Sequence, residues 1–220
     1  YMRTLLVPMA GRSSRFPNLR PKWQLTHPMT NRFMVTEAIL GLNLDFFDNI
    51  YFICLQEHED KYHFTKGFVS ELDELGLREK SNIVLLKEQT SSQSETVYTF
   101  LSGQELEGFV FIKDSDGFYR CDVEERNQVA YFDLNDMDNI NAKAKSYVEL
   151  DINNVLTNIV EKKVISSTFS SGGYGFADAK EFCSTYEKLQ DMEGECYISH
   201  VVFEMMLNGS TFYGTKTSDF

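Results

Sequence analysis

The sequence predicts a three-layer α/β domain with a mixed central sheet, and two features of the chain support this fold class. In the first half, short apolar runs alternate with longer amphipathic segments, which is the pattern of βαβ units in a parallel sheet. In the second half, short strand-like runs and a polar turn suggest antiparallel pairing. The chain has 220 residues, of which 42% are hydrophobic, so it can bury one large core. No linker, repeat or low-complexity tract divides it, and we expect a single domain over residues 1–220.

Four apolar runs in the first half have the length and character of buried strands. These expected strands are residues 5–9, 50–54, 83–86 and 109–113. Apolar residues at helical spacing predict helices over 33–42, after a Thr30-Asn31 cap, and over 58–75, ended by Gly76. The polar turn 89–97 leads into a third expected helix over residues 96–101.

The second half is expected to pair mainly in antiparallel fashion. The expected strands are residues 128–132, 146–150 and 155–160, and the turn 151–154 makes a hairpin of the last two. A glycine-rich segment, 170–176, precedes a helix over residues 178–190 that Asp178 caps. A last helix is expected over residues 201–207.

The composition narrows the classes of function. The formal net charge of −12 argues against general nucleic-acid binding, which needs a basic surface. No apolar run approaches the length of a bilayer span, so we expect no membrane partner. The four cysteines form no C-x-x-C pair, and no histidine stands in a recognisable nucleophile motif. With no signal-peptide pattern at the N-terminus, we expect a cytoplasmic protein with reduced thiols.

The first candidate site follows the strand at residues 5–9. The chain turns at Ala10-Gly11, and glycine lets a ligand approach the main chain closely. The amides that follow could face a phosphate chain, and Arg12, Arg15 and Lys22 add the positive charge that a triphosphate requires. A solvated surface turn is the alternative interpretation. The residues predicted to bind a nucleotide here are Ala10, Gly11, Arg12, Ser13 and Ser14.

The second candidate site follows the strand at residues 109–113. Asp114 and Asp116 flank Ser115 beside a glycine, and paired carboxylates in this position are suited to a hard cation. In open parallel sheets, ligands bind at the carboxyl ends of the strands. A solvated turn is again the alternative.

The segments AGRSSRF and PKWQL, residues 10–16 and 21–25, resemble the signature of the sugar-nucleotide pyrophosphorylases. These enzymes are nucleotidyltransferases with a Rossmann-like sheet of the GT-A type. The chain departs from the family pattern at Ser13, where a second glycine is common, and at Trp23, where proline is frequent. The resemblance implies that Arg15 and Lys22 are catalytic: they contact the nucleotide phosphates and stabilise the transition state.

The resemblance also implies roles for residues further along the chain. Asp116 would bind Mg²⁺ directly, with Asp114 beside it or acting through a water, and Asp219 would be a second metal ligand. Ser91, Ser92 and Gln93 are candidates for base recognition and Thr96 for support of their loop, although an ordinary helix cap explains them equally well. The residues implied to bind the acceptor are Glu161, Lys162, Gly173, which leaves room for substrate, and Tyr197, for which core packing is the alternative.

The predicted reaction transfers a nucleotidyl group from an NTP to a phosphorylated acceptor and releases pyrophosphate. A phosphate monoester is already a nucleophile at neutral pH, so the missing general-base motif fits this chemistry. By resemblance to short single-domain members of capsule and surface-polysaccharide pathways, CTP is the favoured nucleotide. The acceptor could be a sugar 1-phosphate, phosphocholine or another small phosphorylated metabolite.

Two alternatives remain open at this stage. A glycosyltransferase of the same fold would use Asp114-Ser-Asp116 as a D-x-D metal site, but such enzymes lack the loop that contains Arg15 and Lys22. A non-catalytic nucleotide-sensing module is the other alternative. P-loop and dinucleotide-binding proteins are excluded by the absence of their glycine motifs. The oligomeric state stays open.

Overall fold

The computed structural model describes residues 2–11, 20–136, 145–163 and 165–219. The strands are β1 Thr4–Pro8, β2 Asn49–Leu55, β3 Ser81–Leu86, β4 Val110–Lys113, β5 Gln128–Asp133, β6 Ser146–Leu150, β7 Leu156–Glu161, β8 Thr168–Phe176 and β9 Tyr213–Lys216. The helices are α1 Met34–Ile39, α2 Gln56–Tyr62, α3 Thr65–Glu74, α4 Gln93–Gln104, α5 Ala179–Lys188 and α6 Ile198–Leu207. Short 3-10 helices span Lys22–Gln24, Leu44–Phe46 and Leu134–Asp136.

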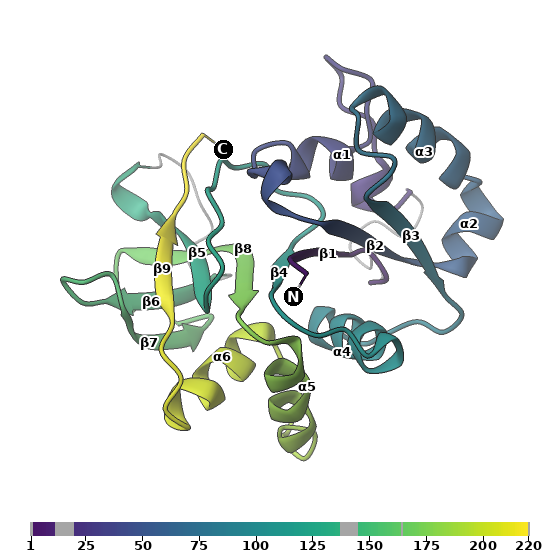
Figure 1. Ribbon diagram of the computed structural model, residues 1–220. Coiled ribbons are helices and arrows are strands. Elements are labelled where there is room, and N and C mark those ends of the chain that lie inside the picture. The colour runs from purple at the N-terminus through teal and green to yellow at the C-terminus, as the bar shows by residue number, and fades with distance from the viewer. Residues whose placement is uncertain (1, 12–19, 137–144, 164, 220) are drawn as a thin grey trace.

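Within these residues, nine strands form one mixed sheet, as predicted (Figure 1). Its main order is β3-β2-β1-β4-β8-β5-β9, and β6 and β7 extend it from β8. The strands β3, β2, β1 and β4 run parallel to one another, whereas β8 is antiparallel to both β4 and β5. The first half of the chain therefore forms the parallel part of the sheet, and the change to antiparallel pairing occurs between β4 and β8.

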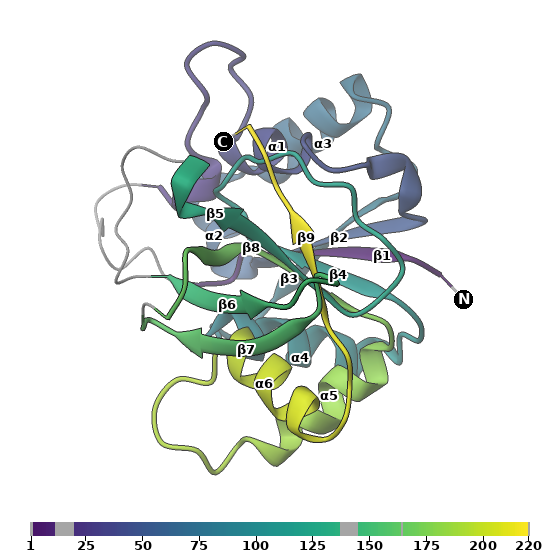
Figure 2. The same cartoon turned by 90° about the vertical axis from the view of Figure 1, so that its left-hand side faces the viewer.

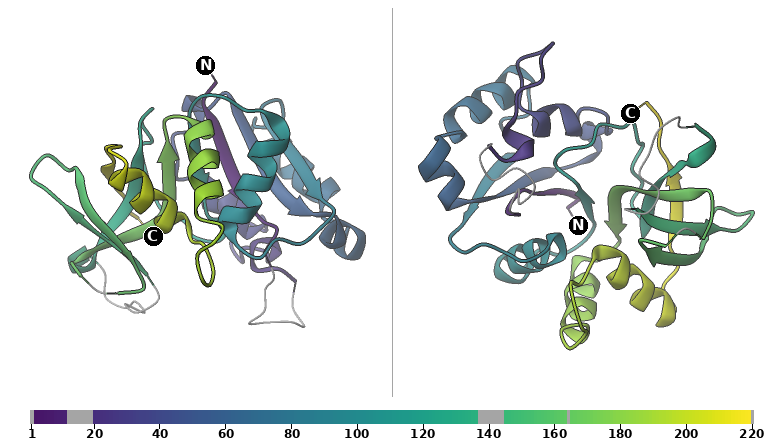
Figure 3. Two further views of the ribbon diagram at one scale, coloured as in Figure 1. Left: turned by 90° about the horizontal axis from the view of Figure 1, so that it is seen from below. Right: turned by 180° about the vertical axis from the view of Figure 1, so that it is seen from behind.

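Helices cover the sheet on both faces, and β1 shows why two separate cores result. Leu5 and Val7 belong to a cluster that includes residues of α1 and α3, while Leu6 belongs to a second cluster with residues of α4, α5 and α6. Successive side chains of a strand point to opposite faces, so a strand buried on both faces is apolar throughout. Figures 1 and 3 show α1 to α3 on one side of the strands and α4 on the other.

The predicted helix over residues 58–75 is in fact two helices. His63 adopts a left-handed conformation (φ 50°) and ends α2, and α3 begins two residues later at Thr65. Glu59 stabilises this junction, since its carboxylate accepts hydrogen bonds from the Thr65 amide (2.9 Å) and hydroxyl (2.5 Å). Apolar residues keep their helical spacing across the junction, so periodicity alone joins the two helices.

Other helix boundaries differ from prediction because capping residues lie elsewhere. The expected Thr30-Asn31 cap of α1 is replaced by Glu71 of α3, whose carboxylate accepts hydrogen bonds from the Phe33 amide (3.0 Å) and the Thr36 hydroxyl (2.6 Å). Helix α4 begins three residues before the expected start and α6 also begins earlier than expected. Asp178 caps α5 as predicted.

The antiparallel half confirms the predicted hairpin. β6 and β7 pair across the turn that follows Leu150, and α6 lies beside β7 (Figure 2). The closing strand β9 is an exception to the antiparallel pairing of this half, because it pairs in parallel with β5. It ends at Lys216, three residues before Asp219.

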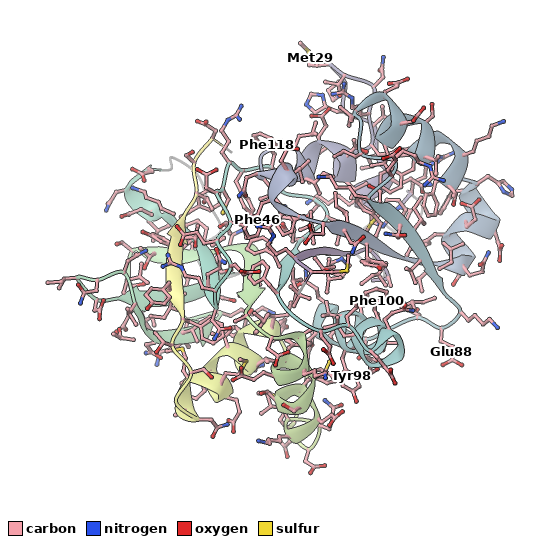
Figure 4. All side chains as sticks on the ribbon, in the orientation of Figure 1. Met29, Phe46, Glu88, Tyr98, Phe100 and Phe118 are labelled. Atoms are coloured by element: carbon pink, nitrogen blue, oxygen red, sulfur yellow. The ribbon has the colours of Figure 1, made fainter. Side chains whose placement is uncertain are left out.

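Among the described residues, no helix combines the length and apolar character needed to cross a bilayer. Figure 4 shows a loop that projects from the domain, with Met29 near its end; this side chain is 86% exposed. By contrast, Phe100 of α4, labelled in Figure 4, is buried. Its ring packs against that of Tyr51 of β2, with 4.8 Å between the centroids.

Gly41→Ala is expected to destabilise the fold. A Cβ atom at this position would lie 1.9 Å from the Tyr119 carbonyl oxygen, so the segment after β4 would have to move. We expect a loss of about 1–3 kcal/mol in the free energy of unfolding, measured by urea denaturation. Gly67→Ala in α3 is the control, because its Cβ would meet only the Phe33 ring at 3.9 Å. The control should gain up to about 1 kcal/mol, and equal effects would contradict the packing argument.

Candidate active site

Three polar segments meet at one edge of the sheet because the strands before them are parallel. Gly11 follows β1, the loop 89–92 follows β3, and Asp114 to Asp116 follow β4. Parallel neighbours end at the same edge, where open α/β sheets bind ligands. This edge contains Gly11 of the first candidate site and Asp114 and Asp116 of the second.

Lys22 and Asp116, which are 94 positions apart in the chain, form an ion pair. The Lys22 ammonium lies 2.9 Å from Oδ2 of Asp116, and the two side chains are 62% and 37% exposed. Burial favours the neutral acid, but the hydrogen bond and charge of Lys22, together with the charge of Lys113, lower the pKa of Asp116 overall. Asp116 is therefore an ionised carboxylate beside a lysine at a solvent-accessible edge.

Asp114 has a different environment from Asp116. Its Oδ1 atom accepts a hydrogen bond from the fully buried ammonium of Lys113, with 2.5 Å between the two atoms. Burial raises the pKa of Asp114 to about 6, although the charge of Lys113 opposes the shift. The two carboxylates of the D-x-D pattern have separate lysine partners, and the hydrogen bond between their own side chains adds to their opposite pKa shifts.

A bulge in β8 places the backbone against Asp114. The register between β5 and β8 shifts from Ala130–Gly173 to Tyr131–Ser170, which leaves two extra residues on β8. One of them, Gly172, has a φ of 96°, and its carbonyl accepts a hydrogen bond from the Asp114 amide (3.0 Å). A Cβ at Gly172 would lie 2.6 Å from Oδ2 of Asp114, so both the conformation and the close approach require glycine.

The packing around Gly173 accounts for a glycine at this position. A Cβ at this position would lie 2.4 Å from the Tyr119 hydroxyl and 2.7 Å from the Phe111 ring. The missing side chain therefore makes room for core packing rather than for a substrate on that side. A substrate-binding role for Gly173 stays a prediction.

A cavity of about 570 Å³ lies beside the first of these segments. Its lining comprises Gly11, Gln89, Thr90, Ser91, Ser92, Gln93 and Glu195. The structure thus brings together the turn after β1 and the polar loop after β3, both predicted to contact a nucleotide. Ala10, next to Gly11, is buried.

Hydrogen bonds fix the polar loop to the start of α4. Ser92 is the N-cap of α4, and its side chain accepts a hydrogen bond from the Glu95 amide (3.1 Å). The hydroxyl of Thr96 donates to the Ser92 carbonyl (3.1 Å) and lies 2.5 Å from the Thr90 hydroxyl. The hydroxyl of Ser94, in the first turn of α4, donates to the carbonyl of Cys196 and so connects the start of α4 to the segment before α6. Thr96 therefore has the contacts expected of a residue that supports the loop.

Lys162 and Tyr197, both predicted to contact the acceptor, meet in the structure. The Lys162 ammonium donates a hydrogen bond to the Tyr197 hydroxyl (2.6 Å), which raises the pKa of Lys162. The neighbouring Glu161 carboxylate accepts hydrogen bonds from Ser146 and from Ser199 (2.7 Å). Tyr197 is half-buried and presents its hydroxyl to Lys162, so it is not simply a core residue.

The structure does not bring Asp219 to the other two acidic residues. Its carboxylate pairs with Arg120 (3.0 Å), and the backbones of Arg120 and Ser218 are hydrogen-bonded to each other. In the described part of the chain, no group of three or more His, Cys, Asp or Glu residues could hold a metal ion. A metal-binding role for Asp219 therefore stays a prediction, and this arrangement does not support it.

Comparison with solved structures identifies the fold. A nucleoside-diphosphate-sugar pyrophosphorylase from Vibrio cholerae RC9 matches with a TM-score of 0.75 and 21% identity, over 96% of this chain and 91% of the other. The inositol-1-phosphate CTP transferase from T. maritima matches with a TM-score of 0.70 and 14% identity, over 100% and 89%. A UDP-glucose pyrophosphorylase solved with UDP-glucose gives a TM-score of 0.70 and 13% identity, over 99% and 92%. The chain has the nucleotidyltransferase fold.

Sequence comparison adds nothing to this result, because no protein-family model and no curated protein matches the chain. The three structural matches described above are each at 21% identity or less, so they establish the fold and leave the reaction to be argued from the site.

Some predicted residues lie outside the described part of the chain, and some described ones escaped prediction. Arg12, Ser13, Ser14 and Arg15 belong to the first group. Lys113 belongs to the second, as do the contact of Gly172 with Asp114 and the place of Glu195 in the lining of the cavity. Lys113 left a signal in the sequence, because it is a charged residue at the end of an otherwise apolar strand, and Gly172 left one as part of the glycine-rich segment 170–176.

Ser92→Ala is expected to loosen the loop that lines the cavity. Loss of an N-cap costs about 1 kcal/mol, and Asp178→Ala at α5 is the matched control with the same type of cap. Both variants should lose similar stability in urea denaturation. Only Ser92→Ala should speed amide hydrogen exchange in residues 89–93, and unchanged exchange there would contradict the assigned role of the cap.

Proposed function

We propose that this protein is a nucleotidyltransferase that joins an NTP to a small phosphorylated acceptor and releases pyrophosphate. The observation that carries the proposal is the Lys22–Asp116 pair at the carboxyl edge of a sheet with the nucleotidyltransferase fold. A group suited to phosphate and a group suited to a divalent cation lie within 2.9 Å of each other, as a reaction between two anions requires.

In the proposed reaction, an oxygen of the acceptor phosphate attacks the α-phosphorus of the NTP. A new P–O bond forms as the bond between the α-phosphorus and the bridging β-oxygen breaks, and its electron pair leaves with pyrophosphate. No proton has to be removed from the nucleophile, so the chain needs no general base. Lys22 stabilises negative charge on the phosphates, and Lys162 orients the acceptor phosphate.

The residues at this edge fit a Mg²⁺ ion. Asp116 would hold it, because it is ionised and accessible, and its lowered pKa keeps it anionic. Mg²⁺ binds proteins through one or two carboxylates and takes its other ligands from phosphates and water, so a larger acidic cluster is not needed. When bound, the ion supplies charge neutralisation between the two anionic substrates.

The nucleotide and the acceptor are finer parts of the same proposal. CTP is the proposed nucleotide, on the resemblance to short single-domain enzymes of capsule and surface-polysaccharide synthesis. The similarity in fold to the inositol-1-phosphate CTP transferase supports this choice. A sugar 1-phosphate or another small phosphorylated metabolite is the proposed acceptor, with Glu161, Lys162 and Tyr197 as its contacts.

Pyrophosphate release from CTP, UTP, GTP, ATP and dTTP, measured with Mg²⁺ against a panel of phosphorylated acceptors, tests the proposal. Release is expected with one nucleotide, and Lys22→Ala or Asp116→Asn should lower the rate about 100-fold to 1,000-fold because each removes a preorganised charge. Lys180→Ala and Asp48→Asn are the matched controls, since each breaks an exposed ion pair elsewhere. Both controls should keep the wild-type rate.

Three outcomes count against the proposal. Nucleotide binding without pyrophosphate release across the panel favours a nucleotide-sensing module. Hydrolysis or transfer from a nucleotide sugar, without pyrophosphate release, favours a glycosyltransferase. Full activity of Lys22→Ala would show that the catalytic charge comes from elsewhere.

A further inference from the structure

Lys113 is a completely buried lysine with all three of its ammonium protons in use. It is 0% exposed, although it is the last residue of β4 and stands directly before the acidic loop. Its Nζ atom donates to Oδ1 of Asp114 (2.5 Å), to the carbonyl oxygen of Asp114 (2.9 Å) and to the carbonyl oxygen of Gly117 (2.5 Å). An ammonium group has three donors, so it has none left for a substrate.

The positions of the three hydrogen-bond acceptors of Lys113 show which segment this lysine holds in place. All three belong to the loop 114–117: two are oxygen atoms of Asp114 at its beginning, and the third is the carbonyl oxygen of Gly117 at its end. The ammonium also lies 4.5 Å from the centroid of the Tyr119 ring, which fixes it from another side. A buried charge is tolerated only where partners satisfy it, so the loop cannot leave Lys113 without a large cost.

The surroundings of Asp114 complete this arrangement. Its Oδ1 atom is occupied by Lys113, and its Oδ2 atom lies in the space that Gly172 and Gly117 leave by having no side chain. Asp116, two residues later, faces Lys22 instead. The two carboxylates of the D-x-D pattern are hydrogen-bonded to each other, and each also has a lysine of its own as partner.

We propose that Lys113 is a positioning residue that serves as a permanent cation beneath the loop 114–117. It withholds the Asp114 carboxylate from a divalent cation and holds Asp116 at the position where it meets Lys22. Asp116 is then the carboxylate of this loop that binds the cation, and Asp114 binds the lysine. This inference rests on the proposed function for its catalytic consequence, but its structural part concerns cation binding alone.

A Mn²⁺ titration of the nucleotide-free protein, followed by the electron paramagnetic resonance signal of free Mn²⁺, tests the structural part. Asp116→Asn is expected to weaken Mn²⁺ binding at least about tenfold, because it removes the anionic ligand. Asp114→Asn is expected to change binding less than about threefold, because its amide oxygen can still accept the hydrogen bond from Lys113.

The Lys113→Met variant tests whether the lysine causes this difference. Without the Lys113 ammonium, the Asp114 carboxylate becomes available to Mn²⁺. Adding Asp114→Asn to this variant should therefore weaken Mn²⁺ binding at least about fivefold. A double-mutant cycle measures this coupling. Lys80→Met is the matched control. Lys80 directly precedes β3, and its ammonium also donates to two backbone carbonyls, those of Leu44 and Phe47. This control should lower the melting temperature without changing Mn²⁺ binding.

Turnover gives the catalytic readout. Lys113→Met should lower kcat at saturating Mg²⁺ about tenfold or more, while Lys80→Met should keep the wild-type kcat. If Lys113→Met does not fold, the contrast between Asp114→Asn and Asp116→Asn in the wild-type background still tests whether Asp114 is withheld from the cation.

Equal weakening of Mn²⁺ binding by Asp114→Asn and Asp116→Asn would overturn the inference, because Asp114 would then be a direct ligand. Wild-type kcat and Mn²⁺ affinity in Lys113→Met would overturn it as well. If the wild-type protein transfers no nucleotide but the Mn²⁺ contrast is found, the proposed function fails and the inference about Lys113 stands. If transfer occurs without that contrast, only the inference fails.

Discussion

The parallel pairing of β1 with β2 and β4 is the constraint on which the rest of the structure depends. Every residue of β1 is buried, so the strand must be covered on both faces, and helices from both halves of the chain provide that cover. Parallel neighbours also end at the same edge. The packing requirement of this buried strand therefore determines at which edge of the sheet the turn after β1 and the acidic loop lie.

The sequence predicts this frame well because each apolar run carries its own signal. The four expected strands of the parallel part are all present, and Asp178 caps its helix. Prediction fails where a conformation depends on contacts from elsewhere in the fold. His63 interrupts a continuous helical pattern with a left-handed residue, and Glu71 from α3 replaces the local cap of α1. Neither effect is encoded in nearby residue spacing.

The same distinction separates the predicted and unpredicted parts of the site. Lys22 and Asp116 each follow a recognisable motif, so their meeting could be expected from strand order. The bulge at Gly172 could not, because it arises from a register shift between β5 and β8. Asp219 lies apart because Arg120 pairs with Ser218 and with Asp219 itself, a contact between distant segments.

Lys113 and Lys22 differ in how strongly their ammonium groups are held by their partners, and this difference fits the different roles proposed for them. Lys113 is buried with three oxygen partners, and removing one member of such a group leaves an unpaired charge, which typically costs about 3–5 kcal/mol. The Lys22–Asp116 pair is partly exposed, and ion pairs near the surface contribute only about 0–1 kcal/mol. For the proposed reaction, Lys22 can therefore exchange Asp116 for a phosphate at little cost, while Asp116 turns to a cation. The loop 114–117, which carries Asp116, stays fixed, because Lys113 has no comparable partner to exchange.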